Sequence, residues 1–153
     1  MTAIFALLLA TAFPSTSQTS WMRPESFHLF IGMRRAVVLE TLKDFGWKAE
    51  KDKRGDLFVD YTDERSFTLH FDHDRLHSIR FELYTIVGQA RQAFDEQRSF
   101  LHATFGKPKK ASKKIVFYNN RLPNVMMVLN DDPKSDIGKK GVGLLVVRYY
   151  DPR

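Results

Sequence analysis

The sequence contains no cysteine. This absence excludes disulfide bonds, thiol catalysis, zinc sites built on thiolates and lipid anchors attached to cysteine. The glycine-rich motifs that hold phosphates or present a nucleophilic serine are absent as well. No motif places a nucleophile beside a base and an orienting group. We therefore expect no catalytic residue, no cofactor and no enzymatic activity.

Long apolar runs are also absent, with one exception near the N-terminus. Residues 4–13 form an apolar run of the length found in signal peptides, and this run is too short to cross a bilayer. Pro14 ends the run, and Ser15 and Ser17 suit the small-residue positions before a cleavage site. These features predict a signal peptide over residues 1–19 and a secreted or periplasmic protein. Because no Lys or Arg precedes the run, a wrongly assigned start or a disordered apolar leader is the alternative.

The remaining chain has the composition of a folded domain. Of the 153 residues, 43% are hydrophobic and 13 are Phe. This content is sufficient for one hydrophobic core, so we expect a single domain over residues 20–153. The formal net charge of +6 favours anionic partners, although it also serves solubility alone.

Hydrophobic periodicity predicts a helix followed by three strands, twice. The apolar stripe of the first predicted helix, between two glycines, is Val37, Val38, Thr41, Leu42 and Phe45. The stripe of the second, over residues 88–107, is Ala90, Ala93, Phe94, Gln97, Leu101 and Phe105. The predicted strands are 56–61, 66–71, 77–84, 113–120, 124–131 and 142–151. We predict an α+β fold of two tandem helix-plus-three-strand units, roughly 27–84 and 88–150, with the helices packed on one face of an antiparallel sheet.

The stretch HFDHDRLH, residues 70–77, places three histidines and two aspartates in eight positions. A metal site requires ligands that converge on one side of the structure. In a regular hairpin, alternation puts His70 and His77 on opposite faces, while His73 lies in the turn. We therefore predict a hairpin turn and no metal site, although a β-bulge at Leu76 would reopen the question. A small metal-dependent enzyme or sensor around His70 and His73 is the alternative.

A basic run, GKPKKASKK, connects the second predicted helix to the next strand. Its charged residues are Lys107, Lys109, Lys110, Lys113 and Lys114. One interpretation is an anion-binding patch for an envelope surface or a polyanion, and the other is a solvated linker. We expect no nucleic acid as a partner, because aromatic residues do not interleave with these lysines.

The sheet face away from the helices is predicted to be mixed in the first half of the chain and, in the second half, too apolar for contact with water alone. Alternation along the strands gives the candidate residues of this face as Phe58, His70, Arg80, Tyr84, Tyr118, Met126 and Val128. Aromatic, Met and Arg side chains are enriched at protein interfaces. We therefore predict that an unidentified protein partner binds there. Residues before Pro24, or a second copy of the chain in a homo-oligomer, are the alternative covers.

Two stretches, FIGMRRAVVLETLKDFGW and LHFDHDRLHSIRFEL, resemble a known superfamily of small exported domains. These are the β-lactamase-inhibitor-protein-like domains, which include outer-membrane assembly lipoproteins of the BamE (SmpA/OmlA) type. The matching residues are Gly32, Met33 and Val37 at the helix start, Phe71, Asp74, Leu76 and Ile79 in the hairpin, and Gly106 and Pro108 after the second helix.

The resemblance covers roughly residues 27–150 as two tandem units. It implies a non-enzymatic module that binds proteins with the open face of its sheet, and it does not identify the partner. Arg34 stands where the pattern has Ser or Thr, and Arg75 stands where it has the turn glycine. The absence of cysteine excludes the lipoprotein anchor and departs from the disulfide-linked inhibitor proteins.

Overall fold

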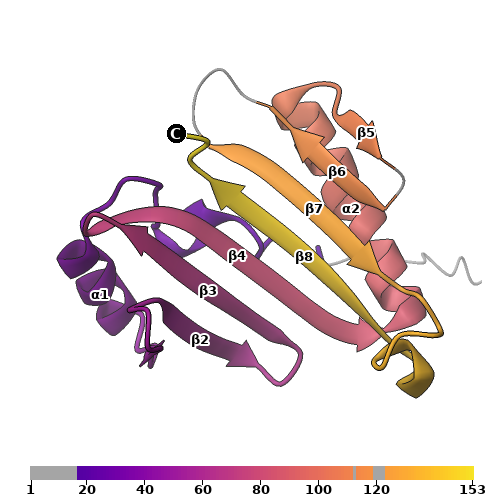
Figure 1. The fold of residues 1–153 in the computed structure, drawn as a ribbon, viewed down its shortest axis with the longest axis horizontal. Helices are drawn as coiled ribbons and strands as arrows, with labels where there is room; N and C mark the ends of the chain where they lie inside the picture. Colours follow the sequence, from indigo (N-terminus) through magenta and orange to yellow (C-terminus); the bar gives the residue numbers. More distant parts are fainter. Residues whose placement is uncertain (1–16, 112, 119–122) are drawn as a thin grey trace, which may run out of the picture.

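The computed structural model describes residues 17–111, 113–118 and 123–153 (Figure 1). The helices are α1 (Arg35–Asp44) and α2 (Val87–Phe105), with two short 3-10 helices, η1 (Pro24–Phe27) and η2 (Gly138–Lys140). The strands are β1 (Glu50–Lys51), β2 (Leu57–Thr62), β3 (Arg65–Asp72), β4 (Arg75–Ile86), β5 (Lys109–Ala111), β6 (Lys114–Phe117), β7 (Asn124–Asn130) and β8 (Val142–Tyr150). Both predicted helices and all six predicted strands are present, with small shifts of their bounds.

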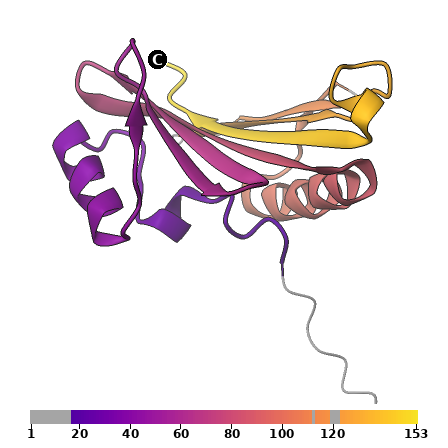
Figure 2. The same cartoon turned by 90° about the horizontal axis from the view of Figure 1, so that it is seen from below.

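All strands belong to one eight-stranded antiparallel sheet with the order β1-β2-β3-β4-β8-β7-β6-β5. Both helices and the described residues before α1, which we call the N-terminal segment, lie on the same side of this sheet (Figure 2). The prediction of an α+β fold with helices on one face of an antiparallel sheet is therefore confirmed. Each helix is followed by four strands rather than three, because the short outer strands β1 and β5 carry no alternation that the sequence could show.

The hairpin between β3 and β4 follows from its turn residues. His73 and Asp74 form the two-residue loop, and both have positive φ, at 46° and 62°. Two-residue hairpin loops favour this left-handed conformation, which Asp, Asn and His adopt more readily than other non-glycine residues. The predicted hairpin turn is confirmed.

The core lies between the sheet and the helices. At one level of the sheet, neighbouring strands direct a continuous row of fully or nearly fully buried side chains toward the helices: Val59, Phe67, Phe81, Val147, Met127 and Ile115. The helix α2 buries its predicted stripe against this row, apart from the half-buried Phe105. Gly143 permits this contact, because a Cβ there would lie 2.7 Å from the Cβ of Ala90.

The predicted stripe of α1 is partly wrong. Val38 and Leu42 are buried, whereas Val37 and Phe45 are exposed. The N-terminal segment occupies the space between α1 and α2, so α1 has less of the sheet to cover (Figure 2). Trp21, Met22, Phe27 and Leu29 of this segment are buried in the core. The sequence analysis missed this contribution, since the segment has no regular periodicity.

The folded part begins at or before Thr19. This residue is fully buried, and its hydroxyl donates a hydrogen bond to Glu96 on α2 at 3.0 Å. Thr19 therefore packs against the described domain, and the predicted boundary between residues 19 and 20 stays a prediction. Residues 1–16, which include most of the predicted signal peptide, lie outside the described residues.

Candidate functional site

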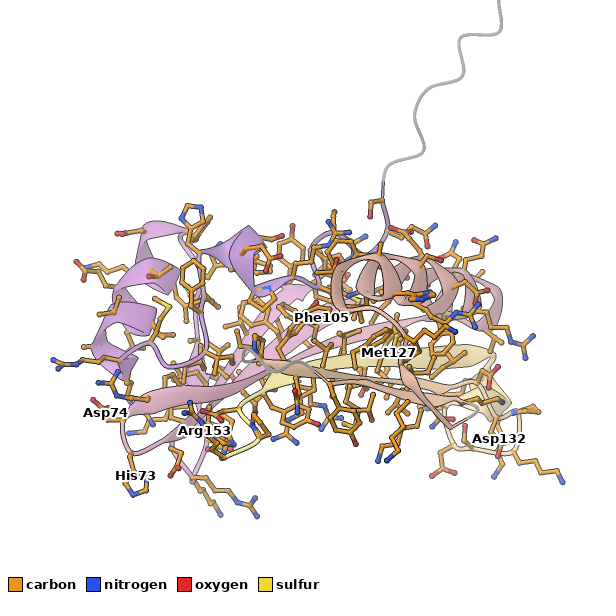
Figure 3. The ribbon with its side chains drawn as sticks, turned by 90° about the horizontal axis from the view of Figure 1, so that it is seen from above. His73, Asp74, Phe105, Met127, Asp132 and Arg153 are labelled. Carbon is orange, nitrogen blue, oxygen red and sulfur yellow. The ribbon has the colours of Figure 1, made fainter. Side chains whose placement is uncertain are left out.

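The sheet has an open face, which is directed away from both helices (Figures 2 and 3). We define the open face by the outward side chains of its long strands: Phe58, Thr68, His70, Arg80, Glu82, Tyr84, Val116, Met126, Val128, Leu144, Val146 and Arg148. The described N-terminal residues lie on the other side, where Trp21 packs edge-on against Phe81 at 5.7 Å. The alternative that residues 17–23 cover the open face is therefore wrong.

The strand register brings the predicted face residues together. One level runs across the sheet from Phe58 through Arg80 to Met126, and the next places Val128 beside Val146. On the same face, His70 lies near the end of β3 and Tyr84 near the end of β4. Because β3 and β4 are antiparallel, these two side chains lie at opposite ends of the strand pair. Tyr118 lies just beyond β6 and is 58% exposed, and the Nζ atom of Lys109 lies 5.9 Å from its ring centroid.

The sequence analysis missed the contribution of β8 to the open face. Leu144, Val146 and Arg148 lie in the middle of this face, between the residues of β4 and β7. β8 reads as an almost continuous apolar run, and a strand that is apolar on both sides shows no alternation to assign its faces. The two faces of β8 can be assigned only from its pairing with β4 and β7.

An apolar strip crosses the second half of the open face. It consists of Val116, Met126, Val128, Leu144 and Val146. Val146 is only 9% exposed although it lies on the open face, where it pairs with Val128 and lines the same hollow as Met126 and Leu144. An open hollow of about 350 Å³ lies over this strip, and Arg80 and Arg148 border it.

The charged residues of the open face are unevenly paired. Arg80 and Glu82 form an ion pair with 2.6 Å between Nη2 and Oε1. Arg148 donates a hydrogen bond to the Ser78 hydroxyl at 3.2 Å and has no carboxylate partner among the described residues. Burial, with a further contribution from the Glu82 charge, raises the pKa of the neighbouring Tyr84 hydroxyl.

The histidine cluster differs from the prediction. The pairing shifts so that His70 opposes Ser78 while Phe71 opposes Leu76, which leaves His77 as the extra residue of a β-bulge. The bulge brings the ring centroids of His70 and His77 to 5.9 Å, so the expected separation onto opposite faces is wrong. His70 Nδ1 lies 2.8 Å from the Asp56 carboxylate. The exposed His73 pairs with Asp72 instead.

Within residues 17–111, 113–118 and 123–153, no three His, Asp or Glu side chains are arranged to hold a metal ion. His73 projects from the hairpin tip at the end of the molecule, as Figure 3 shows together with Asp74. The bulge thus brings two imidazoles together but adds no third ligand from the described part of the chain.

The basic run forms a hairpin of β5 and β6 rather than a linker. The Lys113 ammonium and the Arg91 guanidinium both contact the buried carboxylate of Asp131. These two cations, Lys113 first, hold the pKa of Asp131 below its usual range. Lys107, Lys109 and Lys114 are exposed, and the side chain of Lys110 lies outside the described set. One lysine of the predicted patch, Lys113, thus takes part in an ion pair within the fold, and anion binding by the patch stays a prediction.

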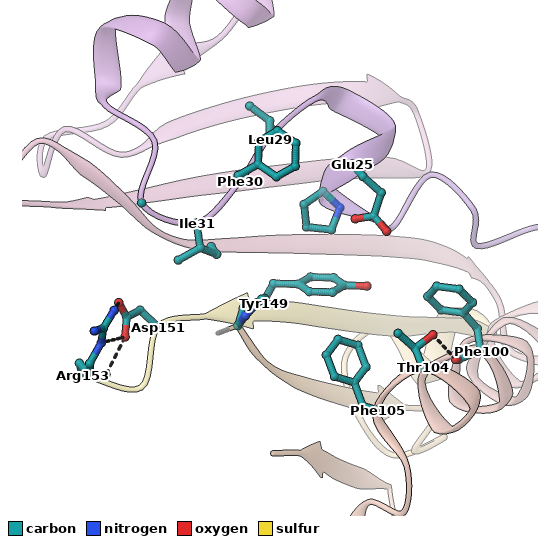
Figure 4. A pocket seen from close by; sticks show the side chains of 13 residues that line it. Glu25, Leu29, Phe30, Ile31, Phe100, Thr104, Phe105, Tyr149, Asp151 and Arg153 are labelled. Atoms are coloured by element: carbon teal, nitrogen blue, oxygen red, sulfur yellow. Dashed lines mark hydrogen bonds and ion pairs between the residues drawn. The ribbon is translucent and has the colours of Figure 1, made fainter. Parts of the chain in front are cut away.

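A second cavity lies on the helix side, between the N-terminal segment, the end of α2 and the C-terminal residues (Figure 4). It has a volume of about 270 Å³, and its walls are mainly apolar, including Leu29, Ile31 and Phe105. Tyr149 forms part of the wall and accepts a hydrogen bond from Gln97 at 3.3 Å. Burial raises the pKa of the Tyr149 hydroxyl, which therefore stays protonated and neutral at physiological pH.

Comparisons with known proteins do not assign this chain to a family. A scan against protein-family models found no match. Searches of curated proteins and of solved structures likewise found no match. In the part of the chain that the structure describes, no helix has the length and apolar character needed to cross a membrane. The resemblance to β-lactamase-inhibitor-protein-like domains stays a prediction.

Proposed function

We propose that this protein is an exported, non-enzymatic module that binds another protein through the open face of its sheet. The observation that carries the proposal is the apolar strip in the middle of that face. An antiparallel sheet with one solvated face ordinarily alternates apolar residues toward the core with polar residues toward water. β7 and β8 instead present Met126, Val128, Leu144 and Val146 on the side away from the core.

The composition of the open face supports a protein rather than a membrane or a polyanion as the partner. Met, aromatic and Arg residues are typical of protein interfaces, and this face combines Met126 with Tyr84, Arg80 and Arg148. The strip residues are half-buried, apart from the buried Val146, and Arg80 and Arg148 border them. Apolar patches with polar residues around them are typical of interaction sites. A second copy of the chain would also cover this face, so the test must distinguish self-association from the binding of another protein.

The order of the elements supports the finer proposal of two tandem units at roughly 27–84 and 88–150. Each unit would contribute one helix and the strands that follow it, with β4 and β8 meeting at the centre of the sheet. This arrangement agrees with the resemblance to the β-lactamase-inhibitor-protein-like superfamily, which supports export and protein binding. The absence of cysteine leaves any disulfide or lipid attachment out of the proposal.

Binding of an anionic envelope surface or polyanion through Lys107–Lys114 is the second candidate. Lys109 and Lys114 favour it, because both are exposed and lie on strands at the sheet edge. Lys113 argues against it, since its ammonium is already engaged with the Asp131 carboxylate, which it shares with Arg91. Protein binding through an apolar strip should survive high salt, whereas binding to a polyanion should weaken steeply.

The test is affinity capture from the envelope and secreted fractions of the host, at low and high salt. The bait is the purified protein, compared with Met126→Lys on the open face and with Gln92→Lys on the exposed side of α2 as a charge-matched control. We expect one protein to be retained at both salt concentrations by the wild type and by Gln92→Lys, and lost with Met126→Lys.

Three outcomes would contradict the proposal. Equal retention of the partner by Met126→Lys would place the binding site elsewhere. Retention of many anionic species at low salt alone would favour the lysines. Capture of the chain itself, with a dimer mass in light scattering that Met126→Lys abolishes, would assign the face to self-association.

A further inference from the structure

Two arginines on the open face are directly opposed. Arg80 on β4 and Arg148 on β8 are register partners across the antiparallel pair at the centre of the sheet. Like charges in directly opposed positions destabilise such a pair. Glu82 forms an ion pair with Arg80, whereas Arg148 has only the Ser78 hydroxyl and the nearby Tyr150 ring as described polar or aromatic contacts. One positive charge at this position therefore lacks a neighbouring carboxylate.

The same two arginines border the hollow over the apolar strip. The other residues that line this hollow are Met126, Val128, Asn130, Leu144 and Val146. The hollow thus combines two guanidinium groups with an apolar floor in a volume of about 350 Å³. We call it the Arg80–Arg148 hollow.

We propose that the Arg80–Arg148 hollow binds an apolar side chain of the partner protein together with an adjacent carboxylate, which lies between the two guanidinium groups. This inference rests on the proposed function and adds the chemistry of the partner. A planar guanidinium group binds a carboxylate through two parallel hydrogen bonds, a geometry that few other side chains can match. The neighbouring apolar side chain would cover Met126 and Val146.

Binding would also relieve a cost that the free protein bears. The opposed arginines repel each other in the free state, and a carboxylate between them reduces that repulsion. Charge complementarity of this kind contributes chiefly to the specificity and rate of association. An acidic Asp or Glu beside a Leu, Met or Phe on the partner would therefore be selected over an apolar segment alone.

The surroundings of the strip favour the same partner. Lys114 opposes Val128 and Lys109 opposes Val116, so cations also border the strip on the side of β5 and β6. No ion-pair partner is found for either lysine among the described residues. A partner surface that complements the strip and these cations has an apolar centre with acidic residues around it. A phosphate polymer would match the charges but would leave the apolar floor uncovered, so we argue for a protein.

The experiment is a selection of short random peptides on the purified protein, followed by affinity measurements with the most enriched peptide. We expect the enriched sequences to share an Asp or Glu close to a Leu, Met or Phe. Replacing Arg148 by Gln should weaken binding of that peptide roughly tenfold or more, as expected for loss of a charge-assisted bidentate contact. Arg98→Gln on α2 is the matched control and should change the affinity less than about twofold.

A peptide in which Asn or Gln replaces the acidic residue completes the test. It should bind the wild type as weakly as the acidic peptide binds Arg148→Gln, and the two changes together should cost little more than one. Circular dichroism of Arg148→Gln should match the wild type, so that loss of folding does not explain the result.

Each other outcome overturns a distinct claim. Enriched peptides without an acidic residue, which still lose affinity with Met126→Lys, would overturn the carboxylate and leave the open face as the binding site. Peptides that neither variant affects would overturn both. No enrichment, or equal competition by inorganic phosphate and by the acidic peptide, would overturn the proposed combination of an apolar anchor and a carboxylate.

Discussion

On the side of the sheet that faces the helices, the two halves carry the same kind of residue. Phe67 and Phe81 in the first half and Met127 and Val147 in the second are all fully buried. On the open face the halves diverge. β3 and β4 present Thr68, Arg80 and Glu82, whereas β6–β8 present the apolar strip.

This difference between the two halves of the open face shows which apolar residues folding requires. Inner residues are apolar in both halves, because helices and the N-terminal segment must bury them to form the core. Residues of the open face need not be apolar, since the first half forms its strands with polar side chains on this face, such as Thr68 beside Arg80. The apolar strip is therefore the part of the sheet whose composition the fold does not explain, and this is why we assign binding to it.

The largest expected effect comes from comparing two neighbours on β8. Val147 is fully buried on the inner side, whereas Val146 lies on the open face. Val147→Asp would place an unpaired carboxylate in the core, at a cost of several kcal/mol against a total stability of about 5–15 kcal/mol. We expect this variant to be unfolded at neutral pH by circular dichroism.

Val146→Asp should remain folded with a lowered melting temperature and should lose partner binding. Val146 is only 9% exposed, but it lines the open hollow beside Arg80 and Arg148, so a carboxylate there would be less desolvated than one at Val147 and the penalty for burying a charge would be smaller. Equal destabilisation by both substitutions would break the distinction between the two faces of β8.

A second comparison concerns how α2 is attached to its half of the sheet. The buried Asp131 carboxylate joins Arg91 on α2 to Lys113 at the start of β6. Asp131→Asn should lower the free energy of unfolding at pH 7 by about 1–2 kcal/mol, because both cations are exposed and solvent screens part of the interaction. Urea denaturation measures this difference, and the exposed Asp136→Asn should change it by less than about 0.5 kcal/mol.

The contribution of Asp131 also has a defined pH dependence. The Lys113 and Arg91 cations lower the pKa of this carboxyl in the folded protein, so the folded state holds the charged form more strongly than the unfolded chain does. The contribution is therefore present above the unfolded pKa of about 3.9 and is lost as the pH falls through the lower folded pKa. The stability difference between wild type and Asp131→Asn should be constant from about pH 5 to 7 and shrink at lower pH. A difference that grows on acidification would contradict this assignment.

The smallest expected effect concerns the lysines beside the strip. Lys107→Gln combined with Lys109→Gln should leave the melting temperature within about 1 °C of the wild type, because both side chains are exposed. Partner binding should weaken slightly at low salt and not at high salt, since solvent ions screen such surface charges. Binding assays at two ionic strengths check this result, and complete loss of binding in this variant would shift the function from the strip to the lysines.

Much of the fold could be predicted from local patterns. The alternation of Phe67, Leu69 and Phe71 identified β3, and His73 and Asp74 in the turn marked the hairpin. The same alternation placed Arg80 and Met126 on the open face. The β8 residues of that face were missed, because Leu144 and Val146 belong to a run that is apolar on both sides.

Other features had no local signal. The extra residue His77 shifts the register of one hairpin and reverses the expected separation from His70. Trp21 and Phe27 join the core from a segment without periodicity, and α1 accordingly exposes Val37 and Phe45. In each case a contact with a distant part of the chain decides the burial, and such contacts leave no spacing in the sequence.

Side-chain period and composition are enough to predict both helices, the six longer strands, the α+β class and the exclusion of cysteine chemistry. The pairing of Arg80 with Arg148 and the contact of Lys113 with Asp131 are visible only in the tertiary structure. Strand order depends on the free energy of burying the inner face of the whole sheet against the helices, which is summed over many distant residues. Local alternation specifies which side chains share a face of one strand, and the packing of all eight strands specifies which of them meet.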